Sequence, residues 1–146
     1  MKIIQADQWY RAMNEEEIIK FLEKPLLMRI GFIDKDGYPI VHPVWFLYKN
    51  GKFIVLSHRN SKKVKRLREN PKVYFTIDIE KPTGVRGKGD AELLVDEEQT
   101  RKIMSEMLKK YGIDESSEIA NQLMDEARES VIINIKPKFL ATWIYE

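Results

Sequence analysis

The feature that most constrains the fold is a series of three β-type segments joined by two tight-turn signals. The turns are predicted at Asp36-Gly37 and Asn50-Gly51, and the segments around them cover residues 26–33, 38–48 and 52–58. Asp-Gly and Asn-Gly supply the positive φ angles that short hairpin turns require. The sequence therefore predicts an antiparallel meander in this part of the chain.

Pro43 interrupts the second of these segments. Because proline has no N–H to donate to a strand ladder, the pairing is expected to break near it. Two interpretations remain open. The break is either an ordinary kink in an edge strand, or it leaves backbone groups beside Val44, Trp45 and Phe46 free to contact a ligand.

The remaining pattern adds helices to this β framework. A capping-box pattern at Asn14 predicts a helix over residues 14–24, and an acidic stretch at about 96–130 predicts a helical insertion with Gly112 as a stop. A further helix is expected at 61–69, and further strands at 73–79, 85–95, 131–135 and 139–145, with a turn at Lys136-Pro137. Strands and helices do not alternate, so a parallel sheet is disfavoured. We expect a mainly β (α+β) fold, a six- to seven-stranded antiparallel barrel with flanking helices.

The composition indicates one globular domain over residues 1–146. Apolar residues make up 43% and charged residues 33% of the chain, there is no cysteine, and the net charge is +2. Apolar runs are too short to span a membrane and the first residues are too polar for a signal peptide, so we expect a cytoplasmic protein with no membrane partner. The near-neutral charge argues against a nucleic-acid binder.

Positive charge is concentrated in residues 57–71. Between Arg59 and Lys72 there are seven cationic residues and one acid. A strand here runs into a helix, and helix N-termini favour anions. We expect Ser57, Ser61, Lys62 and Lys63 to form an anion cradle, with Arg59 within reach, whereas Lys65, Arg66 and Arg68 face solvent. The alternative is a charged helix face without a ligand.

Other candidates for chemistry are scarce. The two histidines, His42 and His58, lie in separate strands and have no ligand-type spacing, so we expect polar strand-end residues and no metal site. Gly87 and Gly89 are not followed by a predicted helix and therefore do not form a dinucleotide fingerprint; they suggest a bend or a close backbone approach.

Three motifs occur in a characteristic order. They are I-G-F-I-D-x-D-G-x-P at residues 30–39, x-P-V-W-F-x-Y-x-x-G at 42–51, and S-x-x-x-S-K-K-V-x-x-L-x-x-N-P-x-V at 57–73. In this order the chain resembles the pyridoxamine 5′-phosphate oxidase-like family of FMN-binding split β-barrels. Lys136-Pro137 and Trp143 resemble the closing strands of that family.

The resemblance implies a homodimer with FMN at the subunit interface. Carried over by position, Ser57, Ser61, Lys62 and Lys63 hold the phosphate, and the stretch Pro43, Val44, Trp45 and Phe46 lies along the flavin ring. Trp143 and the strand at 84–88 approach from the second subunit. No C-terminal extension with Arg and His residues follows Trp143, so we do not expect pyridoxamine phosphate as the substrate.

These observations lead to a ranked set of functions. The first is an FMN-dependent oxidoreductase acting on a small molecule, in which the cofactor carries the chemistry. The alternatives are an F420-dependent reductase and a non-catalytic flavin-binding protein, and some relatives of this shape bind haem. A small nucleic-acid-binding barrel that uses the basic helix is the least favoured.

Overall fold

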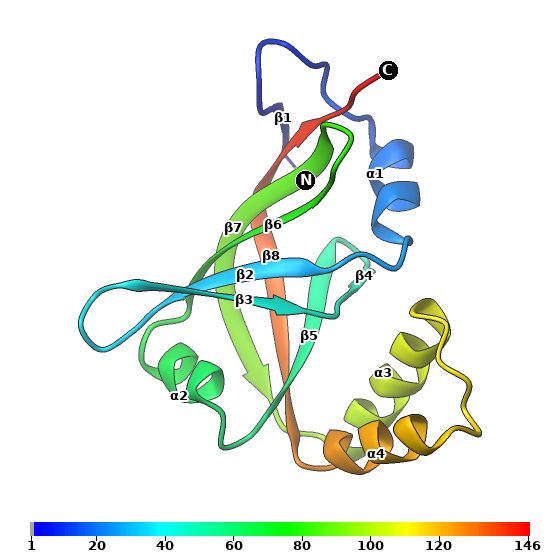
Figure 1. The fold of residues 1–146 in the computed structure, drawn as a ribbon. Helices are drawn as coiled ribbons and strands as arrows, with labels where there is room; N and C mark the ends of the chain where they lie inside the picture. The colour runs from blue at the N-terminus through cyan, green and yellow to red at the C-terminus, as the bar shows by residue number, and fades with distance from the viewer. Residues whose placement is uncertain (1) are drawn as a thin grey trace.

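The computed structural model describes residues 2–146, and a single eight-stranded sheet organises them (Figure 1). The elements in chain order are β1 Ile3–Gln5, α1 Glu15–Leu22, β2 Met28–Ile33, β3 Pro39–Val44, β4 Leu47–Lys49, β5 Lys52–His58, α2 Lys62–Glu69, β6 Lys72–Ile79, β7 Thr83–Leu94, α3 Glu97–Lys110, α4 Glu118–Ala127 and β8 Ser130–Trp143. The strand order is β3-β2-β6-β7-β8-β5-β4, and all of these neighbours are antiparallel. Only the short β1, which pairs with β8, is parallel. The expected α+β fold with a mainly antiparallel sheet is confirmed.

Both predicted hairpin turns are present. Gly37 has φ 86° between β2 and β3, and Asn50 and Gly51 have φ 51° and 76° between β4 and β5. Positive φ angles are the conformations that Gly and Asn tolerate best, so these residues end the strands where the sequence predicted. The registers Ile33 with Pro39 and Lys49 with Lys52 follow from these turns.

The segment predicted as one interrupted strand at 38–48 is two strands at opposite edges of the sheet. β3 ends at Val44 and β4 begins at Leu47, and no ladder joins them, so Trp45 and Phe46 form a bridge across the opening of the barrel. Pro43 lies in β3, the edge strand. An edge strand has a neighbour on one side only, so a proline can point its N-substituted ring toward the free side without breaking the ladder to β2. The break that Pro43 predicted is therefore real, and it splits the barrel.

The predicted final turn at Lys136-Pro137 is wrong, because β8 is continuous from Ser130 to Trp143. On one side, β8 pairs with β5 over residues 130–135 and with β1 over residues 140–142, so Pro137 lies between these two ladders. On the other side, the register with β7 shifts at Lys88 and Gly89, opposite Pro137. A Cβ on Gly89 would lie 2.6 Å from the Lys136 carbonyl oxygen. The close approach expected at this glycine lets the strand continue past the proline.

Two apolar cores hold the fold together. The first fills the barrel and includes the fully buried rings of Phe32, Phe46, Phe53 and Phe75. The second lies between the α3–α4 pair and the outer face of β4, β5 and β8, where Met107 and Leu108 meet Ile132. Alternation along β5 explains both cores, because Phe53 and Val55 face inward while Ile54 and Leu56 face the helices.

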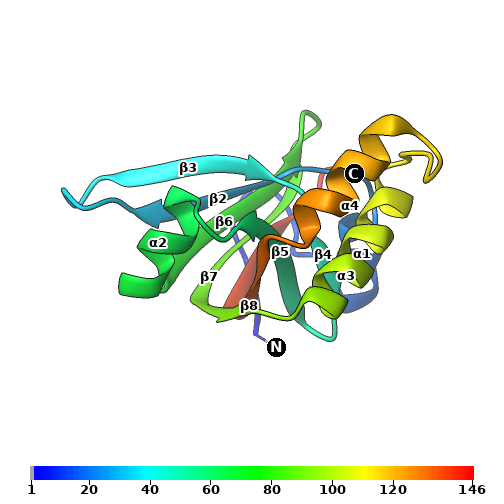
Figure 2. The ribbon, with the colours of Figure 1, turned by 90° about the horizontal axis from the view of Figure 1, so that it is seen from below.

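The helices begin where the sequence predicted. Asn14 and Glu17 form the capping box of α1, Ser61 caps α2, and Gly112 with φ 70° follows α3. Figure 2 shows α2 well apart from the α3–α4 pair. Among residues 2–146, no helix has the length and apolar composition needed to cross a membrane.

Candidate functional site

The N-terminus of α2 brings two hydroxyl groups together. Ser61 is the N-cap and its Oγ accepts a hydrogen bond from the Val64 N–H at 3.2 Å. Ser57, at the end of β5, places its Oγ 2.8 Å from the Ser61 Oγ. A strand end and a helix start therefore converge on one pair of hydroxyls, at the positive end of the α2 dipole.

Lys63 is the most unusual side chain at this position. It is only 8% exposed, and within residues 2–146 it has no hydrogen bond and no salt bridge. Burial lowers the pKa of its ammonium from 10.5. Buried charges are normally paired, so this side chain is suited to receive an anion from solution.

His42, which the sequence pattern did not select, also belongs to this group. Burial lowers its pKa first, and the positive charges of Lys63 and then Lys62 lower it further, so His42 lies near both lysines. The His42 ring also meets the edge of Phe32 at a centroid distance of 5.3 Å. The signal that could have found His42 is its place in β3, directly before Pro43. Its nearness to the two lysines depends on tertiary structure alone.

Two other cations of the basic segment are engaged elsewhere, whereas Lys65 and Arg68 are exposed as expected. Arg59 pairs with Glu129 at 3.1 Å. Arg66, expected on the solvent face, is instead buried; its Nε donates to the Ile33 carbonyl at 3.1 Å and its Nη1 pairs with Glu69 at 2.6 Å. Arg66 therefore anchors α2 to β2, and the cradle narrows to Ser57, Ser61, Lys62 and Lys63 with His42 beside them.

The bridge between β3 and β4 is held by the end of α3. The Trp45 ring stacks on Tyr111 at a centroid distance of 4.4 Å and an interplanar angle of 6°. The Phe46 N–H donates to the Tyr111 hydroxyl at 3.1 Å, and that hydroxyl donates to the Leu26 carbonyl at 2.7 Å. Lys110 donates to the Phe46 carbonyl at 2.8 Å. The expectation of free backbone groups is therefore wrong at Phe46, whose N–H and C=O are both taken.

The electrostatics of this bridge are shifted by burial. Desolvation lowers the pKa of Lys110 to about 8, and its ammonium lies 3.5 Å from the centroid of the Phe46 ring. Burial also raises the pKa of Tyr111 to about 12, although its hydrogen bond with Phe46 acts the other way. The insertion thus places a cation and a neutral phenol against the bridge.

Trp143 is not part of this group within one chain. It lies at the end of β8 and packs over Gly84, where an added Cβ would be 2.4 Å from the ring. Ser57 pairs with Val131, twelve residues earlier in β8, which is roughly 40 Å along an extended strand. The Ser57 end of the cradle lies at one end of β8, and Trp143 lies at the other. Residues 2–146 contain no cluster of three metal-ligating side chains.

The comparison with protein families gives the class of this fold and site. The family model for pyridoxamine 5′-phosphate oxidase matches residues 15–143, which include both hairpins, the bridge and the cradle. The chain belongs to the pyridoxamine 5′-phosphate oxidase family. No curated protein sequence matches the chain.

Solved structures share the same fold at low sequence identity. A conserved hypothetical protein, Rv2991 from Mycobacterium tuberculosis, has a TM-score of 0.81 at 20% identity, over 95% of this chain and 89% of that one. An F420 reductase has a TM-score of 0.70 at 21% identity, over 84% and 94% of the two chains. An FAD-binding protein from Mesorhizobium loti has a TM-score of 0.65 at 22% identity, over 89% and 94%. At these identities the likeness establishes the fold.

Proposed function

We propose that this protein binds FMN, with the phosphate at the cradle of Ser57, Ser61, Lys62 and Lys63, and acts as a flavin-dependent oxidoreductase on a small molecule. The observation that carries the proposal is Lys63, whose side chain is mostly buried and whose ammonium has no partner among the described residues. A phosphate beside it supplies the missing charge and accepts from the serine hydroxyl whose proton is not used between the two serines. The α2 N-terminus adds to the positive potential.

The residues suit FMN at its phosphate end and only in part at its ring end. Pro43 and Val44 belong to an edge strand, and Trp45 presents an aromatic face, so these residues remain available to a planar ring. The backbone of Phe46 is not available, because Tyr111 and Lys110 occupy it. A bound flavin supplies hydride and electron transfer, which fits a chain with few catalytic side chains.

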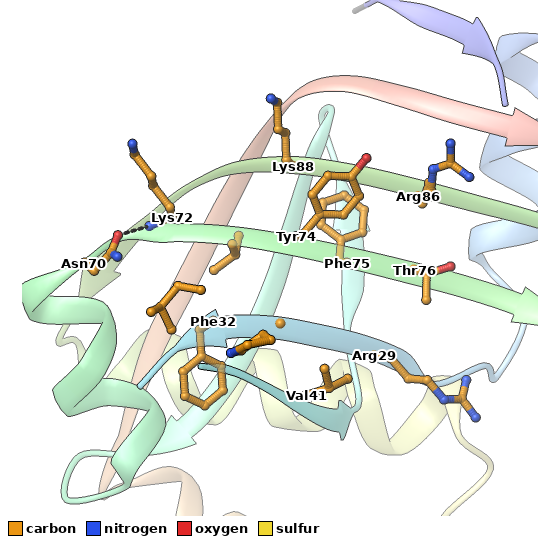
Figure 3. Close-up of a pocket in the computed structure, with 14 residues that line it drawn as sticks. Arg29, Phe32, Val41, Asn70, Lys72, Tyr74, Phe75, Thr76, Arg86 and Lys88 are labelled. Carbon is orange, nitrogen blue, oxygen red and sulfur yellow. Dashed lines mark hydrogen bonds between the residues drawn. The ribbon is translucent and has the colours of Figure 1, made fainter. Parts of the chain in front are cut away.

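A homodimer completes this proposal. The outer face of β2, β3, β6 and β7 carries a mainly apolar hollow of about 570 Å³, and Figure 3 shows Val41 from β3 together with Tyr74, Arg86 and Lys88 from β6 and β7 on this face. Tyr38 and Val41 are 70% and 60% exposed. If two copies meet here around a twofold axis, β7 of one chain lies toward β3 of the other. Such packing would bring Gly84 and Trp143 of one subunit toward the cradle of the other.

The alternative cofactor is F420. The similarity to an F420 reductase supports it, and the cradle suits any flavin-type phosphate. A non-catalytic flavin carrier is the second alternative. The visible absorption spectrum of the purified protein separates these cases, because oxidised FMN, F420 and haem have different bands. A colourless protein that takes up none of them would contradict the proposal.

The cradle itself is tested by titrating FMN into Lys63→Glu combined with Ser57→Ala, with flavin fluorescence as the readout. We expect loss of FMN binding with the fold retained. The matched control is Lys65→Glu, which places the same charge change on the exposed face of the same helix. Equal FMN affinity in the double variant and the wild type would refute the cradle assignment. Equal loss of FMN affinity in the double variant and in Lys65→Glu would mean that the loss comes from long-range charge and not from contacts in the cradle.

A further inference from the structure

A cavity of about 430 Å³ lies between the α3–α4 pair and β5. Its apolar wall consists of Trp45 and Leu56 on the barrel side and Met104, Met107 and Leu123 on the helix side. The size falls in the range of pockets that hold small organic ligands. Met side chains adapt to differently shaped ligands because they are unbranched and polarisable.

This cavity adjoins the candidate cofactor residues. Trp45 and Ser57 both line it, and both belong to the proposed FMN site. The stack on Tyr111 and the hydrogen bonds of Tyr111 and Lys110 to Phe46 tie the bridge to α3. The helical insertion therefore supplies one wall of the cavity and also holds the Trp45 ring that forms the opposite wall.

One charged group at the polar end of the cavity, Glu126, has no partner among the described residues. His58 is engaged, because its Nδ1 accepts from the Asn60 N–H at 3.1 Å and its Nε2 lies 3.4 Å from Glu129. Glu129 in turn pairs with Arg59 at 3.1 Å. The carboxylate of Glu126, also in the lining, has no hydrogen bond and no ion pair in the described part of the chain. This end therefore favours a positively charged or donor group.

We propose that this cavity is the substrate site, and that it takes a flat, mainly apolar molecule with an amine or similar cationic group directed at Glu126. The inference rests on the proposed function and deepens it, because it assigns the substrate class and gives the helical insertion a role. The apolar wall supplies most of the affinity, and Glu126 selects between ligands of the same shape.

The test uses a matched pair of probes, 2-naphthylmethylamine and 2-naphthylmethanol, titrated by calorimetry into the FMN-loaded and the FMN-free protein. We expect the amine to bind several-fold more tightly than the alcohol, about threefold to fivefold, because Glu126 is exposed and screened by solvent. Glu126→Gln is expected to abolish this difference while leaving the alcohol unchanged. In the loaded protein the amine should also shift the visible flavin spectrum, because the cavity shares Trp45 with the candidate ring site.

Leu123→Trp fills the cavity, and Gln122→Trp, its exposed neighbour on α4, is the matched control. Leu123→Trp is expected to weaken both probes at least tenfold, and Gln122→Trp neither. Full probe binding in Leu123→Trp, or equal binding of amine and alcohol to the wild type, would overturn the inference. FMN affinity, measured in the same variants, separates the two proposals. A wild type that binds FMN but neither probe contradicts the substrate site, whereas absent FMN binding in the wild type contradicts the proposed function.

Discussion

Replacing Tyr111 by Phe tests whether the helical insertion holds the bridge of the split barrel. The hydroxyl of Tyr111 accepts from the Phe46 N–H and donates to the Leu26 carbonyl, and these are two backbone groups that no strand pairs. The ring stack on Trp45 is retained in the variant, so the change isolates the hydroxyl. An unpaired buried polar group costs about 1–3 kcal/mol. Because Leu26 is only partly buried, we expect a total loss of about 2–4 kcal/mol in the free energy of unfolding.

The assay is urea unfolding followed by circular dichroism, with Tyr74→Phe as the control. Tyr74 is 45% exposed and its hydroxyl has no partner within residues 2–146, so its loss is expected to change stability by less than about 0.5 kcal/mol. FMN affinity is measured in parallel, since a displaced bridge moves Trp45. If Tyr111→Phe unfolds at the same urea concentration as Tyr74→Phe, the bridge is not held by this hydroxyl and the reasoning fails.

Three further outcomes follow from the same structure. The pKa of Lys110 is lowered from 10.5 to about 8, so between these pH values the unfolded chain binds more protons than the folded chain. The free energy of unfolding should therefore rise with pH across this window. Urea titrations at several pH values should show the rise in the wild type and not in Lys110→Met. Ser61→Ala removes the N-cap of α2 and is expected to lower thermal stability by about 1 kcal/mol, measured by calorimetry, and Ser61→Gly should recover most of that loss. Gly84→Ala drives a Cβ into Trp143 and should destabilise by about 1–3 kcal/mol, whereas Gly31→Ala, whose nearest contact is 3.4 Å, should be milder in the same scan.

Local chemistry accounts for the parts of the fold that were predicted correctly. Gly37 and Asn50-Gly51 set the two hairpins, and Asn14 and Ser61 set helix starts, because each acts on its own backbone or on residues three or four positions away. The error at Lys136-Pro137 has a non-local cause. Proline normally marks a strand end, but here it falls between two ladders on one side and opposite a bulge on the other.

The grouping of the proposed cradle residues was predictable in part. The spacing of Ser57 and Ser61 around a strand end and a helix start indicated an anion site, and the two hydroxyls do lie 2.8 Å apart. Which of seven cations would face that site was not predictable from charge alone. Arg66 turned inward to a carbonyl of β2, and Arg59 paired with an acid from the loop before β8.

The sequence by itself determined the meander, the helix starts, the family and the short list of cationic and hydroxyl residues, because turns, caps and motif order are properties of neighbouring residues. Only the tertiary structure decided that His42 lies beside Lys63, that Phe46 has no free backbone groups, and that the helical insertion encloses a cavity against Trp45. These three facts join residues that lie 21 to about 78 positions apart in the chain. Side-chain burial and hydrogen bonding across such separations are set by packing, which no local pattern encodes.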